Sequence, residues 1–202
     1  MKILLGRGDA NPDSSDEDGR TPLSQAAESG NMDIMKMLLE RGGVNPDSSD
    51  KAGRTPLSYA AESGHWRAVK ILLQHGDVNP DSSDKAGRAP LSYAATAYQN
   101  EGVMKLLLER RDVNPDSSDK AGRTPLSYAA ARQRNEGVVK ILLERGDINL
   151  NSLDELGMTP LSYATRYGHW SVVKTLLQRG NVNPNSSDKA GQTPLSYAAH
   201  FG

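Results

Sequence analysis

The chain has 202 residues, no cysteine, a formal net charge of −1 and 36% hydrophobic residues. Its near-neutral charge argues against a nucleic-acid scaffold, which needs a basic surface. No apolar run approaches the roughly 18 residues of a membrane-spanning helix, and without cysteine there is no disulfide framework. We therefore expect a cytoplasmic protein with neither a nucleic-acid nor a membrane partner.

One phrase recurs six times, as Thr-Pro-Leu-Ser in five copies and as Ala-Pro-Leu-Ser in the third. The copies begin at Thr21, Thr55, Ala89, Thr124, Thr159 and Thr193, so neighbours are 34 or 35 residues apart. Such a period is typical of stacked arrays, in which each unit buries its apolar face against its neighbours.

Each unit reads as two short helices followed by a loop. In the second copy, Thr55 before Pro56 is the arrangement of a helix N-cap followed by proline at the first helical position. Apolar residues at i, i+3 and i+4 predict one helix from Leu57 and another around Val69, separated by Gly64. A loop rich in Asp, Asn, Ser and Pro, here called the finger, leads to the next unit.

These residues carry a family resemblance. The succession Gly-x-Thr-Pro-Leu-x-x-Ala-Ala, glycine, Val-x-x-Leu-Leu and Val-Asn resembles the ankyrin repeat over essentially all of the chain. The resemblance implies an all-α ankyrin solenoid of stacked helix-turn-helix units joined by extended finger loops, acting as a protein-binding scaffold. The Asn-Pro-Asp-Ser-Ser-Asp fingers are similar to fungal ankyrin arrays, including those of nucleotide-binding immune-receptor-like proteins.

The boundaries follow from the period. We expect one ankyrin-repeat domain over residues 1–202, with a partial repeat at 1–15, five repeats at about 16–49, 50–83, 84–118, 119–153 and 154–187, and a partial repeat at 188–202. Neither end shows the polar capping unit that an array needs. We therefore expect a fragment of a longer protein.

Several positions depart from the ankyrin pattern. Serine follows Thr-Pro-Leu where ankyrins usually have histidine, and the next position is Tyr59, Tyr93, Tyr128, Tyr163 and Tyr197, which we expect in the core. The third and fourth copies gain one residue between their helices and lose the usual glycine. Because asparagine tolerates left-handed backbone, we expect Asn100 and Asn135 to preserve the turn.

Variation between the copies concentrates around the turn that joins the two helices. Trp, Tyr and Arg are enriched at interface hot spots, and Trp66 and Trp170 share one repeat position. We predict that a monomeric chain binds a protein partner through the concave surface and this rim, using Glu62, His65, Trp66, Arg67, Tyr98, Gln99, Arg132, Gln133, Arg134, Arg166, Tyr167 and Trp170. Structural packing and unconstrained drift are the alternatives for these positions, and a structural spacer is the alternative for the chain.

The fingers also place oxygen ligands at alternating positions, like the first half of an EF-hand calcium loop. The candidate calcium ligands are Asp77, Asn79, Asp81 and Asp84 in one finger and Asp112, Asn114, Asp116 and Asp119 in the next. The second half of the pattern fails, because Arg88 and Arg123 stand where a bidentate glutamate is needed. The alternative is that these residues only form turns.

No catalytic constellation is visible. The four histidines show no zinc-ligand spacing, and no nucleophile–base pair or phosphate-binding glycine loop appears. We expect no enzymatic activity and no required cofactor, with calcium as the possible exception.

Two positions predict local defects. Ala89 lacks the cap hydroxyl of the other copies, and Arg111 stands where the other copies have glycine. We expect Ala89→Thr to stabilise the array, and Arg111→Gly to do so if the backbone there is left-handed.

Overall fold

The computed structural model describes residues 11–41, 43–98 and 100–200. These residues form helices and loops without a strand. The helices are α2 (Pro22–Glu28), α3 (Met32–Glu40), α4 (Pro56–Glu62), α5 (Trp66–Gln74), α6 (Pro90–Thr96), α7 (Glu101–Leu108), α8 (Pro125–Ala130), α9 (Glu136–Glu144), α10 (Pro160–Arg166), α11 (Trp170–Leu177) and α12 (Pro194–Ala198). None of the described helices has the length and apolar character needed to cross a membrane.

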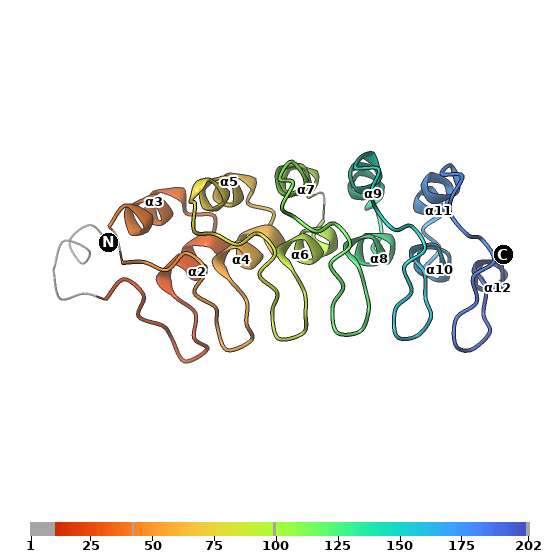
Figure 1. The fold of residues 1–202 in the computed structure, drawn as a ribbon, viewed down its shortest axis with the longest axis horizontal. Coiled ribbons are helices and arrows are strands. Elements are labelled where there is room, and N and C mark those ends of the chain that lie inside the picture. Colours follow the sequence, from red (N-terminus) through yellow and green to blue (C-terminus); the bar gives the residue numbers. More distant parts are fainter. Residues whose placement is uncertain (1–10, 42, 99, 201–202) are drawn as a thin grey trace.

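The helices form two rows in one extended array (Figure 1). The first helix of each unit lies in an inner row, α2, α4, α6, α8, α10 and α12, and the second helix lies in an outer row, α3, α5, α7, α9 and α11. Each helix contacts its own partner and the neighbours in its row. This arrangement confirms the predicted solenoid of helix-turn-helix units, in which burial comes from adjacent repeats.

The repeated phrase begins each inner helix. Thr55 has extended backbone and its Oγ1 accepts the Ser58 N–H at 3.3 Å, while Pro56 takes the first helical position. In the third copy Ala89 offers no side-chain cap, and the buried Ser92 Oγ has no hydrogen-bond partner among the described residues. The expected missing cap is therefore confirmed, and it leaves a second group unsatisfied.

The core runs along the boundary between the two rows. Leu57, Ala60 and Ala61 of α4 and Val69 and Leu72 of α5 are all fully buried. The alanines let the outer helix approach closely, while the leucines fill the space between repeats. Truncating one such leucine to alanine typically costs about 2–5 kcal/mol.

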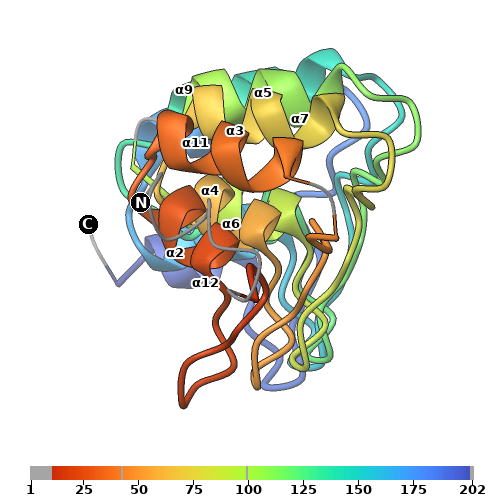
Figure 2. The ribbon, with the colours of Figure 1, turned by 90° about the vertical axis from the view of Figure 1, so that its left-hand side faces the viewer.

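The fingers project from the inner row on the side away from the outer helices (Figure 2). They comprise residues 11–20, 45–54, 79–88, 114–123, 149–158 and 183–192, numbered here as the first to sixth fingers. Successive tips share one backbone bond, such as Lys120 N–H to Ala86 O at 2.8 Å. Gly87 has φ of +83°, and a Cβ there would lie 2.9 Å from the Lys120 nitrogen, so glycine permits this close stacking.

The turns of the longer repeats differ from the prediction. Asn100 and Asn135 have φ of −98° and −104°, so neither is left-handed. In the fourth repeat Arg134, the residue before Asn135, adopts left-handed backbone with φ of 59°. The equivalent residue of the third repeat, Gln99, lies outside the described residues. The asparagines instead tie repeats together, because Asn100 Nδ2 donates to Ala61 O at 2.7 Å and Asn135 Nδ2 to Ala95 O at 2.8 Å.

We expect Arg111→Gly to stabilise the array only if the backbone at Arg111 is left-handed, and this condition is not met. Arg134 is the one non-glycine residue with positive φ in the described part of the chain, so Arg111 does not carry left-handed strain. Its alignment with glycines in other copies reflects a loop that accepts several conformations.

These observations predict that Ala89→Thr stabilises the protein by about 1 kcal/mol. The new hydroxyl would cap α6 and give Ser92 Oγ its missing partner. Urea unfolding would measure the gain, and Thr55→Ala is the matched loss in the second repeat. An unchanged or lower midpoint for Ala89→Thr would contradict this account of the cap.

The second prediction compares two arginines. Arg134→Gly should raise the free energy of unfolding by about 1 kcal/mol, because glycine adopts positive φ without steric penalty. Arg111→Gly should give no gain. Thermal melting of both variants checks this, and equal shifts would show that backbone strain at Arg134 is not the cause.

Candidate interaction surface

The inner helices and the fingers meet at an angle, which gives the array an L-shaped cross-section (Figure 2). The face within this angle is here called the inner surface. The turns between inner and outer helices, around residues 28–33, 62–67, 96–102, 131–137 and 166–171, form its rim. Both lie on the predicted partner-binding side of the array.

A carboxylate in the turn at the tip of each finger joins the finger to its inner helix. In the third finger, Asp84 Oδ1 accepts the N–H groups of Ala86 and Arg88, both at 2.8 Å, and Oδ2 accepts the Tyr93 hydroxyl at 2.6 Å. The same tyrosine bond recurs from Tyr59 to Asp50, Tyr128 to Asp119, Tyr163 to Asp154 and Tyr197 to Asp188. Each tyrosine thus fixes the angle between finger and helix.

The tyrosines combine burial with this polar contact. Tyr59 and Tyr93 are buried, as predicted, whereas Tyr128, Tyr163 and Tyr197 are partly buried. Burial and the hydrogen bond to Asp50 raise the pKa of Tyr59 to about 12. The hydroxyls therefore stay protonated and act as donors at neutral pH.

An arginine stacks on this ladder in the first four fingers. The Arg54 guanidinium lies 4.0 Å from the Tyr59 ring centre and 4.5 Å from that of Tyr93, so it bridges two repeats. Arg20 and Arg54 also form ion pairs with Glu28 and Glu62 at the ends of their inner helices. Sequence reasoning missed these pairs, because the partners are eight residues apart and meet only through the fold.

The rim exposes most of the residues predicted to bind a partner. The exposed fractions are 42% for Trp66, 63% for Tyr98, and 50% for both Tyr167 and Trp170. Glu62, Arg67, Arg132, Gln133, Arg134 and Arg166 are also exposed, while Gln99 lies outside the described residues.

Two of the exposed rings have neighbours within the chain. Arg67 lies 4.4 Å from the Trp66 ring centre, and a Cβ built at Gly102 would lie 3.7 Å from Trp66 Cβ. Tyr167 stacks between Tyr163 and His169, with ring-centre distances of 6.4 and 6.1 Å. These contacts hold the rings in place while leaving about half of each exposed, which favours a rigid contact surface.

His65 has a more structural environment. Its ring lies so close to the preceding turn that a Cβ at Gly30 would approach its Cγ to 2.7 Å. His169, at the equivalent position, places Nε2 3.2 Å from Ala131 O. The histidines thus align with the asparagines that tie repeats together, and contact between His65 and a partner stays a prediction.

The fifth finger carries an apolar tip that sequence reasoning overlooked. Leu153 and Leu156 are 58% and 60% exposed. The other described fingers have serine at the first of these positions, and aspartate or alanine at the second. Comparing the fingers copy by copy would have revealed the difference, but the sequence reasoning concentrated on the turns between helices.

The candidate calcium ligands make protein contacts. Asp84 and Asp119 accept the hydroxyls of Tyr93 and Tyr128, while Asp81 accepts the Asn114 N–H at 2.8 Å and Asp116 accepts the Asn149 N–H at 3.0 Å. Within the described ranges, no three His, Asp or Glu side chains gather as a metal-binding group. The calcium site stays a prediction.

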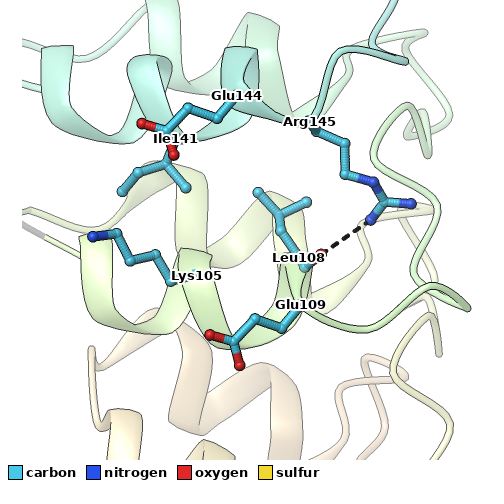
Figure 3. Close-up of a pocket in the computed structure, with 6 residues that line it drawn as sticks. All are labelled: Lys105, Leu108, Glu109, Ile141, Glu144 and Arg145. Carbon is cyan, nitrogen blue, oxygen red and sulfur yellow. Dashed lines mark hydrogen bonds between the residues drawn. The ribbon is translucent and has the colours of Figure 1, made fainter.

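A shallow groove of about 300 Å³ lies on the outer row between α7 and α9 (Figure 3). Leu108 and Ile141 provide its apolar lining, and Lys105, Glu109, Glu144 and Arg145 surround them. Arg145 Nη1 donates to Leu108 O at 3.4 Å across the gap. The groove is a space between neighbouring outer helices whose charges balance, and its residues suggest no nucleophile–base chemistry.

Comparison with known families agrees with the repeat period. A model of ankyrin repeats in three copies matches residues 1–84 and 77–152, and a model of ankyrin repeats in many copies matches residues 142–198. No curated protein matches the chain.

The finger carboxylates predict a defined pH dependence. Burial disfavours ionisation of Asp84, but bonds from the Tyr93 hydroxyl and from the Arg88 backbone and guanidinium outweigh burial and lower the Asp84 pKa. The ionised group therefore adds stability above the ordinary aspartate pKa of about 3.9, and this contribution is lost as the pH falls toward the lowered value.

We expect Asp84→Asn to lower the urea midpoint at neutral pH and to weaken its decline between about pH 5 and pH 3. Asp33→Asn makes the same charge change at an exposed helix position and serves as the control. A decline as steep in Asp84→Asn as in the unmodified protein would contradict this role for the carboxylate.

Proposed function

Because the chain belongs to the ankyrin-repeat family, we propose that it is a protein-binding module whose partner contacts the inner surface and the rim. Ankyrin repeats are generally protein-interaction modules without enzymatic activity. The observation that carries the proposal is the set of half-exposed rings on the rim, Trp66, Tyr98, Tyr167 and Trp170. Large aromatic side chains at fixed positions supply contact area at low entropic cost.

The proposal also covers the oligomeric state, the cellular location and the larger protein to which the array would belong. A monomer in the cytoplasm fits a chain without cysteine. The fungal receptor-like resemblance of the fingers supports a role as the recognition part of a larger protein. A calcium-stabilised spacer is the competing proposal.

The test uses cross-linking and mass spectrometry with an extract of the source organism. Replacing all four rim aromatics by alanine should reduce capture of the specific partner at least tenfold. Because these rings are 42–63% exposed, each change should cost about 1 kcal/mol or less of stability.

Alanine at Lys105, Glu109 and Glu144 on the outer row is the control, and it should leave capture unchanged. Equal loss of partner capture in the rim variant and in the outer-row control, or unchanged capture in the rim variant, would favour the structural spacer.

A further inference from the structure

We propose that the inner surface binds an acidic segment that carries a bulky apolar residue, with the acidic side chains on the third and fourth repeats and the apolar residue at the fifth finger. The proposal rests on the proposed function and specifies the partner's chemistry. It follows from how charge and apolar area change along an otherwise constant ladder.

The four arginines of the ladder all form ion pairs, but with different partners and with different exposure. At the end of the inner helix, Glu28 and Glu62 pair with Arg20 and Arg54, whereas Thr96 and Ala131 occupy the equivalent positions of the next two repeats. The side chains of Arg20 and Arg54 are accordingly 24% and 18% exposed, but those of Arg88 and Arg123 are 37% and 41% exposed. Asp84 and Asp119 pair with these two guanidinium groups, which also lie over the Tyr93 and Tyr128 rings and are still more exposed than those of the first two fingers.

The rim of the fourth repeat adds positive charge. The side chains of Arg132 and Arg134 are exposed and form no ion pair or hydrogen bond within the described ranges. Arg134 is also held on left-handed backbone, which aspartate, asparagine or glycine would adopt more readily. Its side chain is thus presented at an energetic cost, a feature common at functional positions.

In the fifth repeat the finger changes from basic to apolar, while Arg166 keeps a positive charge on the rim. Met158 and Gln192 follow Arg123 at the ladder position, and the fifth fingertip carries Leu153 and Leu156. The tip is close to the fourth finger, because Glu155 N–H donates to Ala121 O at 2.8 Å. Glu155 repels acidic side chains, so the partner's acids belong on the preceding repeats and its apolar residue belongs at the leucines.

The spacing sets the length of the segment. Neighbouring repeats pack at about 8–10 Å, so three repeats span about 20–30 Å. An extended chain covers about 3.3 Å per residue, so a segment of roughly ten residues reaches across this surface.

The probes are therefore two fluorescein-labelled ten-residue peptides, eight glutamates followed by Leu-Trp and the reversed sequence, which together cover either chain direction. Three control peptides replace all glutamates by glutamine, all glutamates by lysine, or the Leu-Trp pair by two serines. Fluorescence anisotropy with the full chain should show that each control peptide binds at least tenfold more weakly than the glutamate peptide. Binding of the glutamate peptide should also weaken as salt rises.

Protein variants locate the contacts. Arg132→Gln combined with Arg134→Gly should weaken binding of the glutamate peptide at least fivefold, whereas Lys105→Gln combined with Arg111→Gln, an equal loss of two positive charges at exposed positions on α7 and the loop after it, should not. Because Arg134→Gly relieves backbone strain, its loss of binding cannot come from unfolding, and thermal melting verifies this. Leu153→Ser with Leu156→Ala gives the fifth finger the residues of its neighbours, and it should remove the preference for Leu-Trp over serine.

The inference is overturned if the glutamine or lysine peptide binds as well as the glutamate peptide, if no peptide binds, or if the double control Lys105→Gln, Arg111→Gln weakens binding as much as the rim variant. Each of these outcomes leaves the proposed function to the capture experiment, which depends on the rim aromatics and assumes no charge on the partner.

Discussion

One carboxylate per repeat holds the inner surface together. In the second to sixth fingers this aspartate accepts two backbone N–H groups of its own loop and the hydroxyl of a tyrosine nine residues later on the inner helix. In the first finger Asp16 accepts two backbone N–H groups and the side-chain amide of Gln25. Finger and helix would otherwise meet through a flexible loop of polar residues. With this tie, the tyrosine rings form a continuous row on which the arginines stack, and the geometry of every surface residue depends on it.

The constancy of this tie allows the rest of the surface to vary. Hydrophobic burial and finger stacking use the same positions in every copy, so exchanges at exposed positions leave the array intact. Glu62, Thr96, Ala131 and Arg166 occupy one structural position with different charges. The chain therefore presents a rigid surface whose side chains change along its axis, from the Glu28 and Glu62 ion pairs, through exposed Arg132 and Arg134, to the exposed leucines of the fifth finger. Such a surface can distinguish partners by the charge and apolar character of their side chains and by the direction in which a bound segment runs along the array.

The sequence was sufficient to predict the architecture because each unit repeats its local signals. The observed helices agree with these signals: in α4, for example, Thr-Pro marks the start, glycine follows the end, and the spacing of Leu57, Ala60 and Ala61 matches the buried face. What it could not supply were contacts between residues that only the fold brings together, within a repeat or between repeats. The Arg54–Glu62 pair and the bond from Asn100 to Ala61 join positions 8 and 39 residues apart. The left-handed residue proved to be Arg134 and not Asn135, because Asn135 is bound to the preceding repeat.

The central claim is that the constant ladder supports recognition on the inner surface and the rim. Hydrogen–deuterium exchange of the chain, with and without the partner captured from extract, tests it most directly. The account predicts slower exchange in the fingers and in the turns around residues 96–102, 131–137 and 166–171, with the outer helices α5, α7 and α9 unaffected. Protection confined to the outer helices would contradict it.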